Sequence, residues 1–147
     1  MENDKKRTLV LLVEDDLGDQ KLMKTAIMSQ GCELELMITP NGESAMNYLQ
    51  ICKQEPQKYQ KPCLILLDLN MPGMGGKEFL RQIKADDALS AIPVVVVTTS
   101  DSESDISECY KLQAAGYIQK AAMPAEFNEI LKKLVRYWFL TSVVLKV

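Results

Sequence analysis

Five short apolar runs alternate with five amphipathic stretches along this chain of 147 residues, and this alternation constrains the fold more than any other feature. The runs are Thr8–Val13, Leu34–Thr39, Cys63–Leu67, Val94–Val97 and Gly116–Gln119. The first, third and fourth are almost continuously apolar, which is typical of strands covered on both faces of a parallel sheet. We therefore predict one doubly wound α/β domain, with helices on both faces of a parallel sheet in three layers, α/β/α.

The amphipathic stretches carry apolar residues at helical spacing, and we expect these stripes to face the core. The last stripe is the strongest and extends to Trp138. Asn41 is placed to cap the second helix, and Ser102 with Asp105 three residues later matches a capping box. Segment 53–62 is polar and holds two prolines, so we expect it to form a surface loop.

The chain contains no histidine, and this absence excludes several kinds of active site. There can be no Ser-His-Asp triad, no Cys-His pair and no histidine-ligated zinc. A net charge of −3 argues against nucleic acid as the main partner, because phosphate backbones attract clustered basic residues. The four cysteines form no CxxC pair, so we expect buried, reduced thiols rather than a zinc site.

The two ends of the chain differ in character from the domain between them. Residues 1–7 are expected to be a solvated leader, and the apolar run behind them is too short for the core of a signal peptide. No stretch approaches the roughly 20 apolar residues of a membrane span, so we expect a cytoplasmic protein without a membrane partner. The apolar tail 140–147 either folds back on the last helix or buries an interface; a homodimer is favoured because exposed apolar patches usually mark contact surfaces.

Side chains that can carry chemistry stand at the ends of four predicted strands. Glu14 and Asp15 follow the first strand, and Asp68 follows the third. Thr98 ends the fourth, and Lys120 follows the fifth. Because ligands of open parallel sheets collect outside the carboxyl ends of the strands, we expect these side chains to converge on one edge.

A cluster of Glu14, Asp15 and Asp68 would suffer strong repulsion at neutral pH unless a cation relieved it. A hard divalent ion and the ammonium of Lys120 can both do so. Oxygen ligands at a partly open site favour Mg²⁺. The ion and Lys120 would in turn attract a phosphoryl group, near which Thr98 supplies a hydroxyl. The sequence therefore predicts magnesium-dependent phosphate chemistry at this edge.

The same strand ends resemble the receiver domain of two-component response regulators. The matching segments are Val13-Glu14-Asp15-Asp16, Leu66-Leu67-Asp68-Leu69-Asn70-Met71-Pro72-Gly73, Pro93-Val94-Val95-Val96-Val97-Thr98 and Gly116-Tyr117-Ile118-Gln119-Lys120. The Asp-x-Asn-Met-Pro-Gly segment is the most specific. The resemblance implies a receiver domain over residues 8–139, with five parallel strands in the flavodoxin-like order 2-1-3-4-5.

The resemblance also implies a metal site and a phosphoacceptor. Asp68 would take the phosphoryl group from the phosphohistidine of a sensor histidine kinase. Asp15 and Asp68 would bind Mg²⁺ through their side chains, and Glu14 would take part through a water molecule. The backbone carbonyl of Asn70 would complete the protein ligands.

Further roles fall on the remaining strand ends. Lys120 would pair with the phosphoryl group, Thr98 would swing towards it, and Tyr117 would turn inward in response. Ser100 and the side chain of Asn70 occupy positions that tune the lifetime of the acyl phosphate. The family usually has proline directly after the lysine, whereas this chain has Ala121. A non-proline cis bond costs about 2.5–4 kcal/mol, so the isomer of the Lys120–Ala121 peptide and the aim of the lysine stay open.

The leading interpretation is a single-domain response regulator that signals through a phosphorylation-dependent change of its surface. It would be no enzyme beyond its own phosphotransfer and dephosphorylation. Segments Asp15–Asp19, Thr98–Ser100 and Tyr137–Phe139 resemble a subgroup that includes cyanobacterial phytochrome response regulators. A phytochrome-like kinase is the partner that this subgroup implies.

Three other interpretations stay open at this point. The first is a magnesium-dependent phosphohydrolase with an aspartate nucleophile, although such enzymes usually carry Asp where this chain has Asn70. The second is a receiver that takes no phosphate and acts as a binding module. The third, a nucleotide- or flavin-binding domain, is disfavoured because acids stand where a glycine-rich loop would cradle phosphate.

Overall fold

A sheet of five parallel strands forms the centre of the protein, in the order β2-β1-β3-β4-β5. The computed structural model describes residues 8–31, 33–120, 123–141 and 144. The strands are β1 (Thr8–Val13), β2 (Leu34–Thr39), β3 (Leu64–Leu67), β4 (Val94–Thr98) and β5 (Gly116–Gln119). The predicted doubly wound α/β fold and the strand order 2-1-3-4-5 are thereby confirmed.

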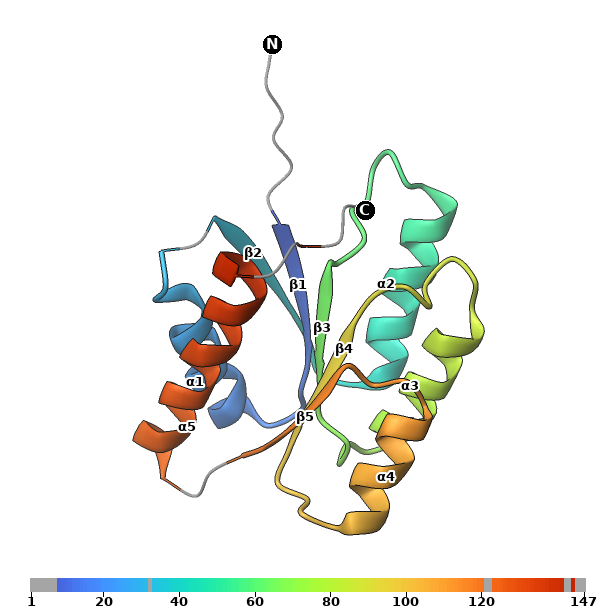
Figure 1. Ribbon diagram of the computed structural model, residues 1–147. Coiled ribbons are helices and arrows are strands. Elements are labelled where there is room, and N and C mark those ends of the chain that lie inside the picture. Colours follow the sequence, from blue (N-terminus) through green and yellow to red (C-terminus); the bar gives the residue numbers. More distant parts are fainter. Residues whose placement is uncertain (1–7, 32, 121–122, 142–143, 145–147) are drawn as a thin grey trace.

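Helices cover both faces of this sheet (Figure 1). On one face lie α1 (Leu17–Met28) and α5 (Pro124–Val135), and on the other lie α2 (Gly42–Gln54), α3 (Gly76–Ala85) and α4 (Glu103–Lys111). Beyond α5 the chain continues as a π-helical segment, η1 (Arg136–Thr141). No helix in the described part of the chain is both long enough and apolar enough to cross a membrane.

Two apolar cores lie on opposite faces of the sheet, and they explain why three of the strands are almost wholly apolar. From β1, Leu11 and Val13 enter the core under α2 and α3, while Val10 and Leu12 enter the core under α1 and α5. The same division holds along β3 and β4. Strand β2 is an edge strand and is only partly buried, because one of its sides has no neighbouring strand.

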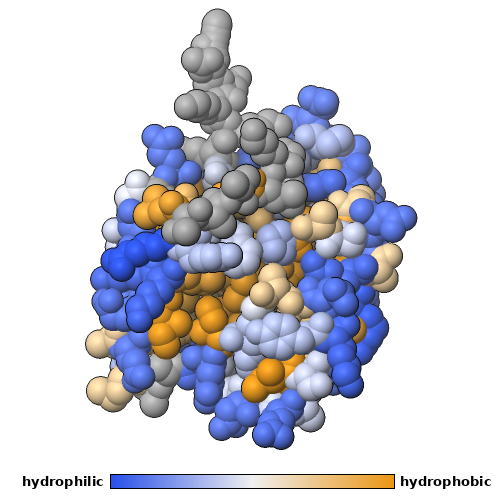
Figure 2. Space-filling model, viewed as in Figure 1, coloured by the Kyte–Doolittle hydropathy of each residue, from blue (hydrophilic) through white to orange (hydrophobic). Residues whose placement is uncertain are grey.

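Strand β5 forms the other edge and lies towards the viewer in Figure 1. On that face, hydrophobic residues gather in the middle, between α5 and α4, and hydrophilic residues surround them (Figure 2). All four residues of β5 keep some exposure to solvent. This face therefore presents apolar surface beside an unpaired strand edge.

The predicted caps and boundaries agree with the structure, except that the capping box of Ser102 and Asp105 is only half formed: the N–H of Ser102 donates to Ser100 Oγ at 3.3 Å and not to Asp105. The side chains of Asn41 and Ser102 accept the backbone hydrogen bonds that cap α2 and α4. Cys63 precedes β3 rather than opening it, β4 extends one residue further to Thr98, and α2 extends to Gln54, inside the predicted loop. Cys63 and Thr98 are both buried, so burial does not mark the exact ends of these strands.

The predictions for the cysteines and for the two ends of the chain can be compared with the structure only in part. Three cysteines, Cys52, Cys63 and Cys109, are buried free thiols, as predicted. Cys32, the leader 1–7, Ala121 and all of the tail except residues 140, 141 and 144 lie outside the described residues. The isomer of the Lys120–Ala121 peptide therefore stays a prediction.

Candidate functional site

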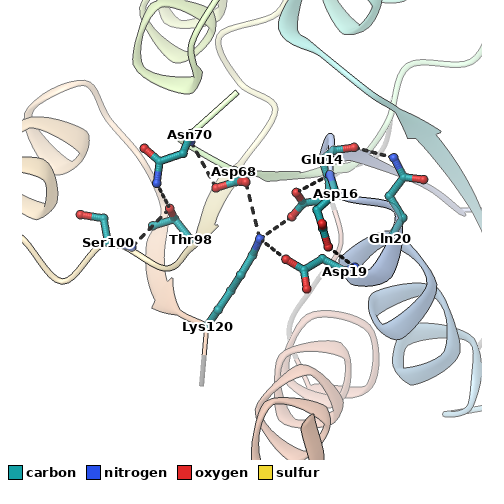
Figure 3. Close-up of polar contacts among 9 residues, drawn as sticks. All are labelled: Glu14, Asp16, Asp19, Gln20, Asp68, Asn70, Thr98, Ser100 and Lys120. Carbon is teal, nitrogen blue, oxygen red and sulfur yellow. Dashed lines mark hydrogen bonds and ion pairs between the residues drawn. The ribbon is translucent and has the colours of Figure 1, made fainter. Parts of the chain in front are cut away.

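The parallel register brings the ends of four strands to one edge of the sheet. Val13 of β1 lies beside Leu67 of β3, and Leu67 lies beside Val96 of β4. Thr98 in turn lies beside Gln119, the last residue of β5. The side chains that follow these positions meet in one pocket, as Figure 3 shows.

Three carboxylates form an acidic cluster in this pocket. Glu14, Asp15 and Asp68 each offer an oxygen atom, and these atoms lie within 4.8 Å of one another. Glu14 is only 1% exposed and Asp68 is 6% exposed, whereas Asp15 faces solvent. Burial raises the pKa of Glu14 to about 7; the nearby charge of Asp68 adds to the rise, while a hydrogen bond from Lys120 opposes it. The predicted cluster of acids is thus present.

The ammonium of Lys120 lies among these acids. Its Nζ donates to Glu14 Oε1 at 2.6 Å and to Asp19 Oδ2 at 2.7 Å, and it lies 3.5 Å from Asp68 Oδ2. Only 7% of the lysine side chain is exposed. Burial disfavours the charge, but the hydrogen bonds to Asp19 and Glu14 outweigh it and raise the pKa of Lys120 above its usual range. Lys120 is therefore a buried, charged counter-ion, and Asp19 is a partner that the sequence did not single out.

The turn from β1 into α1 fixes Glu14. The backbone N–H of Asp16 donates to Glu14 Oε2 at 3.2 Å, and the side chain of Gln20 donates to the backbone carbonyl of Glu14 at 2.7 Å. Asp16 itself caps α1 by accepting from the N–H of Asp19 at 2.8 Å. Glu14 is thereby held from both its main chain and its side chain.

Polar contacts on the other side of Asp68 join the ends of β3 and β4. The side-chain amide of Asn70 donates to Thr98 Oγ1 at 3.4 Å, and its backbone N–H donates to Asp68 Oδ1 at 3.3 Å. Thr98 is fully buried, and the backbone N–H of Ser100 lies 3.5 Å from its hydroxyl. The Tyr117 hydroxyl donates to the carbonyl of Ser100 at 2.9 Å. The two predicted switch residues, Thr98 and Tyr117, are thus linked through Ser100.

A second polar network, which the sequence did not reveal, connects this loop to two helices. The hydroxyl of Ser100 donates to Asp105 Oδ2 at 2.6 Å, and Lys77 Nζ lies 2.5 Å from Asp105 Oδ1. Lys77 also pairs with Glu108 at 3.0 Å. Because Lys77 belongs to α3 and the two acids belong to α4, the network holds the two helix ends together beside the site.

Glycine is required where α3 approaches the end of β3. A Cβ atom at position 76 would overlap the carbonyl oxygen of Asp68 and lie 2.7 Å from the Cα of Leu69. Both contacts are with main-chain atoms, so no side-chain rotation relieves them. The absence of a side chain at Gly76 lets α3 begin directly against the loop that carries Asp68 and Asn70.

The comparisons with known proteins agree with this geometry. The family model of the response regulator receiver domain matches residues 10–132. Response regulator Rcp1 of Synechocystis sp. is 35% identical over 133 residues, which are 90% of this chain and 90% of Rcp1. The probable methanogenesis regulatory protein FilR2 of Methanothrix harundinacea is 32% identical and is matched over 83% of its length, with 88% of this chain covered.

Solved structures show the same similarity. The Mn²⁺-bound form of Rcp1 has a TM-score of 0.88 and 34% sequence identity, and the match covers 95% of this chain and 99% of that one. The phosphorylated cyanobacterial phytochrome response regulator RcpA has a TM-score of 0.88 and 36% identity over the same shares of both chains. Together with the acids, threonine and lysine at the strand ends, these matches establish that the chain belongs to the response regulator receiver domain family of two-component systems.

Proposed function

We propose that Asp68 is the phosphoacceptor of this receiver domain and takes its phosphoryl group from a histidine kinase. The proposal rests on the charged groups that surround Asp68. Its carboxylate lies within 4.8 Å of oxygens of Glu14 and Asp15, and 3.5 Å from Lys120 Nζ. A nucleophile for phosphoryl transfer needs such cationic partners, because negative charge spreads over the phosphoryl oxygens in the transition state.

The acidic cluster fits a divalent cation, and we propose Mg²⁺. Glu14, Asp15 and Asp68 offer only oxygen atoms, and one of the three is open to solvent, as suits an ion that keeps several waters. In this proposal the side chains of Asp15 and Asp68 and the backbone carbonyl of Asn70 are the protein ligands, and Glu14 takes part through a water molecule. A bound ion would relieve the repulsion among the acids and neutralise charge on the phosphoryl oxygens.

In the proposed reaction, an oxygen of Asp68 attacks the phosphorus of a phosphohistidine. The P–O bond to Asp68 forms while the P–N bond breaks, and the electron pair of that bond goes to the imidazole, which takes up a proton. Lys120 Nζ is placed to donate to a phosphoryl oxygen, since it already lies 3.5 Å from the attacking carboxylate. These 147 residues contain no histidine, so a phosphohistidine donor has to lie outside them.

The polar contacts around Thr98 support a route from the site to the surface. If the Thr98 hydroxyl turns towards the phosphoryl group, it leaves the amide of Asn70 and the N–H of Ser100. Ser100 also holds Tyr117 and Asp105, so a shift of this loop acts on β5 and α4 together. Phosphorylation then biases the protein between two arrangements of one surface.

The partner that we propose is a sensor histidine kinase of the phytochrome type. Its support is the similarity to Rcp1 and to a structure described as a cyanobacterial phytochrome response regulator. We also propose that the protein acts in the cytoplasm and does no chemistry on a separate substrate. The matched family supports this proposal and favours it over a phosphohydrolase and over a receiver without phosphate.

We further propose that the C-terminal region takes part in a homodimer. Tyr137 is 56% exposed and Leu140 is 64% exposed, so large apolar side chains of η1 face solvent in one copy. Sedimentation of the full chain and of a truncation after Tyr137 tests this proposal. A dimer that becomes a monomer on truncation supports it, and two monomers contradict it.

Phosphorylation by acetyl phosphate with Mg²⁺, followed by intact-protein mass spectrometry, tests the main proposal. The wild type should gain one phosphoryl group, and Asp68→Asn should gain none. Asp86→Asn is a suitable control, because Asp86 pairs with Lys53 on the surface at 2.6 Å, outside the pocket. Equal labelling of wild type and Asp68→Asn would overturn the assignment, and multiple turnover of a small phosphate monoester would favour the hydrolase.

A further inference from the structure

Asp19 has a contact that the proposed function does not require. Its carboxylate accepts from Lys120 Nζ at 2.7 Å, as closely as Glu14 does, although Asp19 lies in the first turn of α1 and not at a strand end. Lys120 and Asp19 are 101 residues apart in sequence. The contact therefore joins helix α1 to the lysine that follows β5.

The carboxylate of Asp19 does not make the hydrogen bond that an acid three residues after a helix cap usually makes. Asp16 and Asp19 have the spacing of a capping box, in which the acid three residues after the cap reaches back to the N–H of the cap residue. Here the N–H of Asp16 donates to Glu14 instead, at 3.2 Å. Only the first half of the box is formed, by Asp16 and the N–H of Asp19. The carboxylate of Asp19 is thus left for Lys120.

The three contacts of Lys120 match the three N–H groups of an ammonium. The contacts with Glu14 and Asp19 are at hydrogen-bond distance, and the third contact, with Asp68, is at 3.5 Å. Lys120 can therefore donate to a phosphoryl oxygen on Asp68 while its hydrogen bond to Asp19 stays intact. Asp19 acts as an anchor in this arrangement and does not compete with the phosphoryl group.

We propose that Asp19 is a positioning residue for phosphoryl transfer, which aims Lys120 at Asp68 from helix α1. This inference rests on the proposed role of Asp68. Its physical basis is that a lysine has a long, flexible stem, and a second fixed acceptor restricts where the ammonium can lie. Asp19 is about one-third exposed and Glu14 is buried, so the ammonium of Lys120 is held between a partly exposed acceptor and a buried one.

Two substitutions separate the positioning effect from the effect of charge. Asp19→Asn and Asp19→Ala both remove one negative charge, so both ease the approach of an anionic phosphodonor to the same degree. Asp19→Asn keeps an oxygen that can accept from Lys120, whereas Asp19→Ala does not. The ratio between these two variants therefore reports on the anchor alone.

The first measurement is the initial rate of phosphorylation by acetyl phosphate in the presence of Mg²⁺. We expect Asp19→Ala to react about fivefold more slowly than Asp19→Asn, which corresponds to about 1 kcal/mol, the net contribution of a typical hydrogen bond. Asp86→Ala is the matched control, because it breaks an Asp–Lys ion pair of similar length, with Lys53, away from the site. This control should react at the wild-type rate.

The second measurement does not depend on phosphorylation. A buried, hydrogen-bonded ammonium exchanges its protons slowly, so the ¹⁵Nζ signal of Lys120 should be resolved in metal-free protein and absent from Lys120→Arg. Asp19→Ala should broaden or shift this signal, and Asp19→Asn should largely keep it. A merely structural role in α1 would lower the melting temperature of Asp19→Ala without moving the signal.

Equal rates for Asp19→Asn and Asp19→Ala, or an unchanged Lys120 signal in Asp19→Ala, would overturn the proposal. Failure of the proposed function has a different signature: the wild type and Asp68→Asn would then be labelled alike, whatever the variants of Asp19 do. Thermal melts identify any variant that fails to fold, and in that case the more conservative Asp19→Asn still has to keep the Lys120 signal.

Discussion

The close approach of α3 to the end of β3 gives a prediction whose size follows from the structure. Gly76→Ala adds a Cβ that overlaps the carbonyl oxygen of Asp68 and lies 2.7 Å from Leu69 Cα, closer than the 3.0 Å below which real Cβ contacts essentially never fall. Since both neighbours are main-chain atoms, the start of α3 has to move away from the loop. The same loop carries the proposed phosphoacceptor.

The magnitude follows from two opposing effects. Overpacking of a well-packed region typically costs about 1–3 kcal/mol, and the upper part of this range, about 2–3 kcal/mol, applies here because the overlapped atoms belong to the main chain. Alanine regains up to about 1 kcal/mol, because it favours the helix more than glycine does. We therefore expect Gly76→Ala to lower the free energy of unfolding by about 1–2 kcal/mol, or the melting temperature by about 2–8 °C. Phosphorylation by acetyl phosphate should also slow, since Asp68 moves with the loop.

The preceding glycine provides a matched control. A Cβ at Gly75 would meet its nearest neighbour, the carbonyl oxygen of Leu69, at an ordinary 3.7 Å, and the φ of −70° suits any residue. Urea unfolding followed by circular dichroism should show less than about 0.5 kcal/mol of change for Gly75→Ala. If Gly76→Ala were as stable as Gly75→Ala, the argument from close approach would be refuted.

Three further predictions concern single polar contacts. Asp16→Ala removes the cap of α1 and should cost about 1 kcal/mol in urea unfolding; no change would show that the cap contributes nothing. Tyr117→Phe removes the bond to the Ser100 carbonyl and should also cost about 1 kcal/mol, with a larger loss pointing to changed ring packing. Hydrogen bonds from Lys77 and Ser100 lower the pKa of Asp105, so its contribution to stability should be present above about pH 4 and be lost as the pH falls through the lowered value. In Asp105→Asn the free energy of unfolding should therefore fall less steeply as the pH is lowered below about 4. The same steepness in the variant and the wild type would contradict this assignment.

Much of the fold could be predicted because strands that are buried on both faces of the sheet appear in the sequence as short apolar runs. Strands β1, β3 and β4 lie in the middle of the sheet, so nearly every residue in them has to be apolar. The prediction was one residue off at Cys63, which is buried without belonging to the strand. Buried loop residues and buried strand residues look alike in a sequence.

The helical continuation beyond α5 was predicted, but its π geometry was not. The apolar stripe that extends to Trp138 has a helical period, and the structure is helical there. The change from α to π geometry at Arg136 alters the hydrogen bonding of the main chain, which apolar side chains do not record. Hydrophobic periodicity alone does not distinguish the two.

The site was predictable where its residues end strands and was missed where they lie on helices. Glu14, Asp68 and Lys120 were found because parallel strands end at one edge. Asp19 was missed, because its contact with Lys120 depends on how α1 is oriented over the sheet, which local sequence does not determine. Two signals were available: Asp19 belongs to a segment that resembles the phytochrome subgroup, and it has the capping-box spacing from Asp16. Neither signal identifies Lys120 as the partner of Asp19.

The central claim is that Asp68 carries the phosphoryl group, and locating the acyl phosphate tests it most directly. After reaction with acetyl phosphate and Mg²⁺, borohydride reduction converts a phosphorylated aspartate to homoserine, which tandem mass spectrometry assigns to one position. We predict homoserine at position 68 in the wild type, and at no position in protein that was not phosphorylated. Homoserine at Asp15 or at another acid, with Asp68 unmodified, would contradict the account.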